Sequence, residues 1–158
     1  MRLIRISTLP LVFVLAGCFM PAATGNRLEN RFRDARVSEV RAQLQILREH
    51  AAQQGWSVVG EPHIGWLEKT YNENDEPRFT LPSTGRHALL AVCDGNCTDI
   101  DLVVLDSGRR RLGADLEPDD RPVVEFSGAG GDVVMGRVTI PGCNINRCAY
   151  GVMLVGQR

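Results

Sequence analysis

The sequence predicts a mainly β fold: an antiparallel β-sandwich, jelly-roll-like and of about seven strands, preceded by one N-terminal amphipathic α-helix. Residues after Trp56 form short apolar runs, separated at regular spacing by turn-forming residues, as in sandwiches. The stretch before Trp56 repeats its apolar residues at steps of three and four, which is typical of a helix. No helical segment separates the later runs, and this disfavours a parallel α/β sheet.

Residues 1–17 are predicted to be a secretory signal peptide. The first five residues, MRLIR, are basic, and the apolar core that follows, Leu9–Ala16, is too short to remain as a membrane-spanning helix. Small residues precede Cys18 directly at the end of this core, and this pattern indicates cleavage before Cys18. Ordinary cleavage after Gly25 is the alternative, because Ala23 and Gly25 are small residues at suitable spacing.

The motif Leu15-Ala16-Gly17-Cys18 resembles the lipobox of bacterial lipoproteins. The resemblance implies that Cys18 is acylated, with chains such as palmitate, and becomes the first residue of the mature chain. Acyl chains buried in a bilayer would hold such a chain firmly to the membrane. Phe19 is not the aspartate that marks inner-membrane retention, so we expect anchoring to the outer membrane, facing the periplasm.

The mature chain is mildly acidic. Removing residues 1–17 leaves 141 of the 158 residues, enough for one domain with a hydrophobic core. The signal contains two of the 18 basic residues and none of the 19 acidic ones, so the mature net charge is −3. A surface that binds nucleic acid would need a basic stripe, so no nucleic-acid partner is expected.

Residues 18–25 are predicted to be a lipidated tether, and residues 26–55 an amphipathic helix. Gly55 stands where a left-handed C-cap belongs. The apolar stripe is too short to indicate a coiled coil, so we expect it to pack on the β domain of the same chain. The stripe consists of Val37, Val40, Leu44, Leu47 and Ala51.

Residues 56–158 are predicted to be the β-sandwich domain. The breaks between its apolar runs are rich in Gly, Pro, Asn, Asp and Ser, which favour turns. The expected strands are Gly65–Tyr71, Arg78–Leu81, Arg86–Cys93, Asp99–Asp106, Val123–Ser127, Val133–Ile140 and Cys148–Val155.

No segment carries a recognisable catalytic motif, so no catalytic residues are expected. His50, His63 and His87 are scattered singly, and neither H-E-x-x-H nor G-x-S-x-G occurs. The run LPSTG at residues 81–85 matches the sortase sorting pentapeptide in letters. It stands in mid-chain before a strand, so we expect it to form a turn.

Four cysteines remain besides Cys18, and in an exported chain an even number indicates disulfides. A zinc site would have tighter spacing and suits reducing compartments, and a redox pair would have the spacing C-x-x-C. We expect the local pairs Cys93–Cys97 and Cys143–Cys148, since each brackets a short loop, although four cysteines allow three connectivities. Such small loops remove little chain entropy, so the bonds would mainly fix loop shape.

The runs AVCDGNCTDIDLVVLDSG, DDRPVVEF and RVTIPGCNINRCAYGVMLVG resemble small exported bacterial proteins related to the bacterial pre-peptidase C-terminal domain. The resemblance covers roughly residues 65–158, and its most specific part is Asp99-Ile100-Asp101-Leu102. It implies a compact β-sandwich that acts as a noncatalytic accessory module, here behind a helix. Most domains of the larger family lack both cysteine pairs, and some relatives bind calcium or carbohydrate polymers.

The loop that follows Cys93 offers oxygen ligands of the kind that calcium prefers. Its EF-hand pattern is incomplete, because Asp99 and Leu105 stand where glycine and glutamate belong. We expect the carboxylates to cap turns instead, and no cofactor to be required, with calcium as the alternative. The candidate metal ligands are Asp94, Asn96, Asp99 and Asp101, with a second cluster at Asp115, Asp119 and Asp120.

These carboxylates are not equivalent. Asp99 and Asp101 share one face of a predicted strand, opposite Ile100. We expect Asp101 to contribute more to stability than Asp94, because Asp94 is predicted to lie in an exposed turn.

The sequence therefore predicts a noncatalytic cell-envelope lipoprotein that acts as a binding or structural module. Its expected partners are the membrane, through the lipid anchor, and an envelope protein or polysaccharide. The alternative is an accessory subunit or hydrolase that acts on envelope polymers and depends on calcium. A groove with aromatic side chains would favour sugar binding, and an apolar patch a protein partner. The aromatic residues of interest are Trp56, Trp66, Tyr71 and Tyr150.

Overall fold

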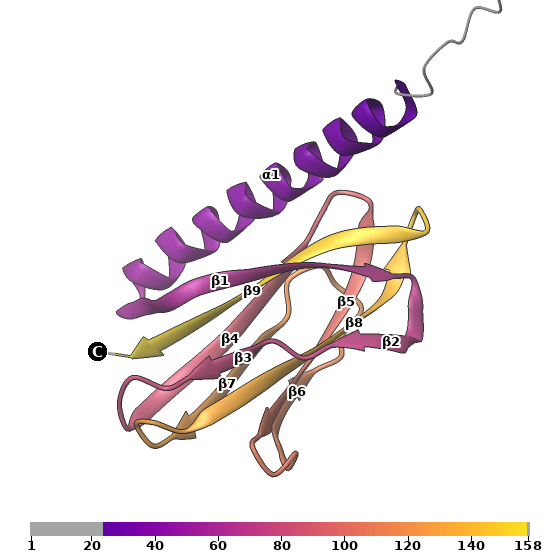
Figure 1. The fold of residues 1–158 in the computed structure, drawn as a ribbon. Coiled ribbons are helices and arrows are strands. Elements are labelled where there is room, and N and C mark those ends of the chain that lie inside the picture. The colour runs from indigo at the N-terminus through magenta and orange to yellow at the C-terminus, as the bar shows by residue number, and fades with distance from the viewer. Residues whose placement is uncertain (1–23, 158) are drawn as a thin grey trace, which may run out of the picture.

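The structure, a computed structural model, describes residues 24–157 as one helix followed by nine strands (Figure 1). The predicted signal peptide and the lipidation site Cys18 lie outside the described residues. Helix α1 spans Thr24–Gln53. The strands are β1 (Trp56–Glu68), β2 (Thr70–Asp75), β3 (Arg78–Thr80), β4 (Gly85–Cys93), β5 (Cys97–Asp106), β6 (Arg111–Asp115), β7 (Val123–Gly128), β8 (Val133–Cys143) and β9 (Arg147–Gln157).

The strands form two antiparallel sheets. One has the order β1-β9-β4-β7, and the other the order β2-β8-β5-β6 with β3 also paired to β8. Because β2 and β3 both pair with β8, they behave as one interrupted strand, and eight strands then follow jelly-roll order. The predicted jelly-roll-like sandwich with an N-terminal helix is confirmed.

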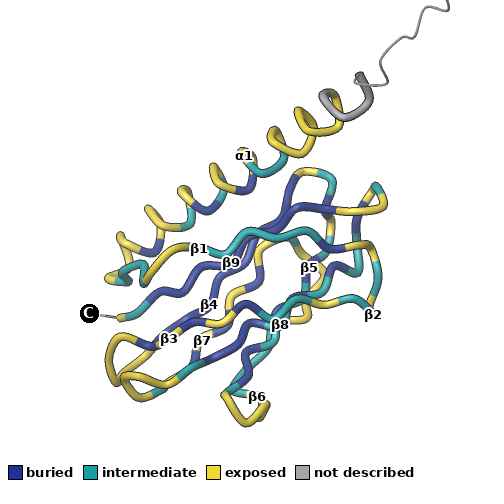
Figure 2. Tube along the Cα trace, in the orientation of Figure 1, coloured by how far each residue is buried: buried dark blue, intermediate teal, exposed yellow. Residues whose placement is uncertain are grey.

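Two hydrophobic clusters hold the fold together. Figure 2 shows buried positions, in dark blue, along one face of α1 and through the strands of both sheets. The larger fills the space between the sheets and includes Leu89, Leu102 and Val138, all fully buried. The smaller lies between α1 and the outer face of the first sheet. Neither cluster contains a residue before Val40, so residues 19–158 hold the whole described core.

Helix α1 crosses the outer face of the sheet over β1, β9 and β4 (Figure 1). Val40, Leu44 and Ala51 of the predicted stripe are buried there. Gly151 of β9 allows the close approach, because a Cβ at this position would lie 2.7 Å from a Leu44 methyl carbon. Gly55 has a φ of 82°, which confirms the predicted left-handed cap. No helix within residues 24–157 is long and apolar enough to cross a membrane.

The strand count of about seven was too low. The first strand begins at Trp56 rather than Gly65, because a β-bulge between Val59 and His63 absorbs the polar, Gly- and Pro-containing stretch. Strands β2 and β6 were not expected, because both are polar edge segments whose backbone pairing, not apolar alternation, makes them strands.

Candidate functional site

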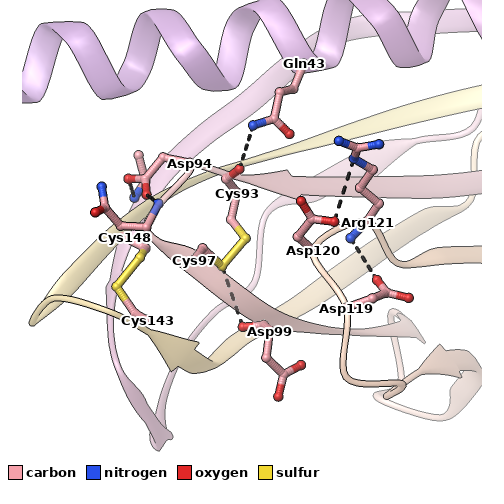
Figure 3. The surroundings of a disulfide bond; sticks show 12 residues. Gln43, Cys93, Asp94, Cys97, Asp99, Asp119, Asp120, Arg121, Cys143 and Cys148 are labelled. Carbon is pink, nitrogen blue, oxygen red and sulfur yellow. Dashed lines mark hydrogen bonds and ion pairs between the residues drawn. A yellow bond between two sulfur atoms is a disulfide. The ribbon is translucent and has the colours of Figure 1, made fainter.

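Two disulfide-bonded loops lie side by side at one end of the sandwich (Figure 3). Cys93 is bonded to Cys97 and Cys143 to Cys148, which confirms the local pairing. The loops are joined directly, because the Asn144 amide donates a hydrogen bond of 2.7 Å to the Asn96 carbonyl. The second loop is therefore held both by its own disulfide and by its neighbour.

Asp94 is buried, with 1% of its surface exposed, so the prediction of an exposed turn was wrong. Its Oδ1 accepts a hydrogen bond of 3.0 Å from the Asn96 amide, and its Oδ2 accepts one of 2.8 Å from the Ala149 amide. The Asp94 amide donates in return to the Ala149 carbonyl. The carboxylate thus joins the first loop to β9, and both of its oxygens serve the backbone.

A groove opens beside the second loop, under the N-terminal half of α1. We call it the Trp66 groove, and it encloses about 490 Å³. Strand β1 supplies Trp66, which pairs in register with Ala149 of β9. The lining residues are Glu29, Phe32, Arg33, Arg36, Trp66, Ile145, Asn146 and Arg147.

The helical wall of the groove lies on the same face of α1 as the apolar stripe, closer to the N-terminus. Stepping back from Val40 by four, three and four residues gives Arg36, Arg33 and Glu29. The same helical face therefore changes from apolar to charged where it passes from the core to the groove. This change from apolar to charged residues along one helical face is visible in the sequence. It could have pointed to the groove, which the sequence analysis did not predict.

Arginine side chains converge on the Trp66 ring. The guanidinium carbons of Arg33 and Arg36 lie 5.4 Å and 5.9 Å from its centre, within cation–π range. Arg36 also donates a hydrogen bond of 3.2 Å to the Arg147 carbonyl, which joins the helix to the loop. Among the side chains that the structure describes, no carboxylate forms an ion pair with Arg33, Arg36 or Arg147.

The loop wall of the groove is fixed from several sides. The disulfide Cys143–Cys148 closes the segment that contains Ile145 and Asn146. The Asn146 carbonyl accepts a hydrogen bond of 3.1 Å from the amide of Lys69, the residue that follows β1. A binding surface that is formed in advance loses little conformational entropy when a ligand arrives.

Of the remaining candidate metal ligands, Asp99 and Asp101 lie on β5 and Asp115 ends β6. Asn96, Asp119 and Asp120 lie in the connecting loops. Burial, followed by the negative charges of Asp101 and Asp119, raises the pKa of Asp99. Burial also raises the pKa of Asp101, against a hydrogen bond of 3.2 Å that it accepts from the Thr139 hydroxyl. Within residues 24–157, no group of three or more His, Cys, Asp or Glu side chains is arranged to hold a metal ion. The calcium alternative stays a prediction to be tested in solution.

A second polar cluster joins His63, Asp75 and Tyr150. Tyr150 is fully buried, and its hydroxyl donates a short hydrogen bond to Asp75 Oδ2. His63 Nε2 lies 3.1 Å from the same oxygen and 3.2 Å from the Tyr150 hydroxyl. Burial, and then the Asp75 carboxylate, raise the pKa of Tyr150, so its hydroxyl stays protonated. Although burial opposes it, hydrogen bonds from Tyr150 and His63 hold the pKa of Asp75 below its usual value.

The four aromatic residues of interest therefore occupy different environments. Tyr150 is a core residue that satisfies a polar cluster, and Trp56 packs against the smaller hydrophobic cluster. Tyr71 is 73% exposed on β2. Trp56 also lines two smaller pockets, one with Arg48 and one with Glu125, but only one charged side chain, Arg86, lies over its ring. Trp66 lines the larger groove and has two arginines over its ring.

No protein-family model matches the chain, and no curated protein matches it. Among solved structures, the chain is similar to the pre-peptidase C-terminal domain of a collagenase from Bacillus anthracis. The similarity has a TM-score of 0.46 at 10% sequence identity, over 61% of this chain and 89% of that domain. That domain belongs to the family that the sequence resembles. At this identity the similarity concerns the fold alone, and the function of the collagenase is not carried over.

Proposed function

We propose that the chain is a noncatalytic binding module of the bacterial cell envelope, anchored to the membrane by a lipid on Cys18. The Trp66 groove is its binding surface. One observation carries this proposal: a groove of about 490 Å³ combines an aromatic side chain with three arginines that form no ion pair with a described carboxylate. Unpaired guanidinium groups around an aromatic ring are suited to a ligand that brings its own negative charge.

The location rests on two features of the chain. The lipobox-like motif at Leu15–Cys18 supports export and acylation. The two disulfides fit an oxidising compartment such as the periplasm. Orientation toward the periplasm from the outer membrane is part of the proposal.

Binding without catalysis is supported by the chemistry of the groove. Its titratable lining consists of arginines and a single carboxylate, Glu29. Glycoside hydrolysis ordinarily uses two carboxyl groups, so this lining does not favour a hydrolase of envelope polysaccharides. His63, which has a carboxylate partner, contacts the buried phenol of Tyr150 instead of lining the groove.

Site-specific crosslinking in intact cells tests the proposal. A photoreactive amino acid at Asn146, in the groove, should trap an envelope component. The same amino acid at Ser107 should not trap it. Strand β5 starts at the first disulfide loop with Cys97 and ends at Asp106, so Ser107 lies at the far end of the strand. Trapping at Asn146 should weaken at least severalfold when Arg147→Gln is added. Equal trapping at Asn146 and Ser107, or trapping that ignores Arg147→Gln, would contradict the assignment of the groove.

A second test addresses the anchor. Cys18→Ala should move the protein from the membrane pellet to the soluble fraction, or block its processing. Wild-type protein that is already soluble and begins at Asn26 would show that the lipobox interpretation is wrong.

A further inference from the structure

We propose that the Trp66 groove binds the phosphate headgroup of an anionic phospholipid, in the same bilayer that holds the lipid anchor. This inference rests on the proposed function, because it names the ligand class of that site. The domain then docks on the membrane with the end that carries the N-terminal half of α1, instead of extending away from it.

Charge complementarity supports a phosphate ligand. Arg33, Arg36 and Arg147 contribute three positive charges to the groove, and Glu29 contributes the one negative charge. The mature chain as a whole is acidic, at −3, so the positive charge of the groove does not follow from a basic composition. The planar fork of a guanidinium matches phosphate oxygens, and arginine is less strongly hydrated than lysine.

The position of the groove along the chain points to a membrane lipid and not to a soluble anion. Thr24, the first residue of α1, follows Cys18 by six positions, with five residues between them. A fully extended segment of this length spans about 20 Å, so the acyl chains on Cys18 keep the start of α1 close to the bilayer surface. The residues of α1 that line the groove begin at Glu29, less than two helical turns from Thr24.

Apolar side chains beside the arginines fit the same surface. Leu28 and Phe32, four residues apart on α1, are 58% and 65% exposed. Phe32 and Trp66 both line the groove, and Trp66 is half-buried. Apolar and aromatic groups next to cationic ones are the combination by which amphipathic segments lie in a bilayer interface. A soluble polyanion would contact the arginines but would leave the exposed side chains of Leu28 and Phe32 in water.

Vesicle binding tests the inference, with residues 19–158, which hold the whole described core. Co-sedimentation compares vesicles of phosphatidylglycerol and phosphatidylcholine in equal parts with vesicles of phosphatidylcholine alone. The groove variant is Arg33→Gln with Arg147→Gln. The matched control is Arg41→Gln with Arg48→Gln, which removes two charges from exposed positions farther along α1.

We expect the wild type to bind the anionic vesicles at least tenfold more tightly than the neutral ones, and less tightly as salt rises. The groove variant should lose about thirtyfold in affinity, and the control less than about threefold. Brominated anionic lipid should quench the tryptophan fluorescence of the wild type more than that of Trp66→Phe. This measurement reports lipid contact at the groove even if the arginine variant folds poorly.

Several results would overturn the lipid assignment. Equal losses in the groove variant and the control would mean that binding is only general electrostatics. Groove-dependent binding of inorganic phosphate, without binding to vesicles, would mean that the ligand is a soluble anion. Tighter groove-dependent binding to dextran sulfate than to vesicles would indicate an acidic polysaccharide. If crosslinking at Asn146 in cells still depends on Arg147 while vesicles fail to bind, the binding function stands and only the lipid is wrong.

Discussion

Asp94 joins the first disulfide loop to β9, so replacing it with asparagine should destabilise the domain. Asparagine keeps one acceptor oxygen and turns an NH₂ group toward either the Asn96 or the Ala149 amide, both of which now donate to the carboxylate. The site is 1% exposed, so water cannot replace the lost acceptor. A buried amide left without a partner costs about 1–3 kcal/mol, so we expect Asp94→Asn to cost about 2 kcal/mol.

Urea unfolding, followed by circular dichroism, measures this cost. The control is Asp34→Asn on the exposed surface of α1, which should change the free energy of unfolding by less than about 0.5 kcal/mol. Asp101→Asn should cost less than Asp94→Asn, because asparagine can still accept the Thr139 hydrogen bond. This order reverses the expectation from the sequence. A loss for Asp94→Asn that is no larger than for Asp101→Asn would refute the role given to the buried carboxylate.

Three further predictions concern packing, charge and metal. Gly65→Ala should cost about 1–3 kcal/mol in urea unfolding, since its Cβ would lie 2.6 Å from the buried Tyr150 ring, whereas Gly108→Ala should be nearly neutral. The raised pKa of Asp99 means that the folded state holds this proton more tightly than the unfolded state, so stability falls as pH rises above the ordinary value of 3.8. Asp99→Asn should therefore gain stability relative to the wild type between pH 4 and pH 7, and an unchanged difference would contradict the shift. Millimolar calcium should move the melting temperature by less than about one degree relative to chelator, and a clear shift that Asp99→Asn abolishes would establish a metal loop.

The helix and most of the strands could be predicted because their burial follows local periodicity. The stripe from Val40 to Ala51 faces one sheet, so its spacing alone identifies it. The disulfides could be predicted because each closes a loop of a few residues. Strand β6 could not, because Arg111–Asp115 becomes a strand only by pairing with β5.

The site was harder to predict because its parts come from distant segments. The burial of Asp94 depends on the Ala149 amide, 55 residues further along the chain. The Trp66 groove brings together one face of α1, the end of β1 and the second disulfide loop. Trp66 could be marked from the sequence as an aromatic residue of interest, but its arginine partners follow from where α1 crosses the sheet.

The central claim is that ligands reach this protein through the Trp66 groove. Two-dimensional NMR of ¹⁵N-labelled residues 19–158, titrated with short-chain phosphatidylglycerol below its micelle concentration, tests it most directly. We predict that the largest shifts fall on the Trp66 indole N–H, on residues 29–36 and on residues 144–147, while the hairpin around Ser107 stays unchanged. Shifts that concentrate on the hairpin or spread evenly over both sheets would contradict the account.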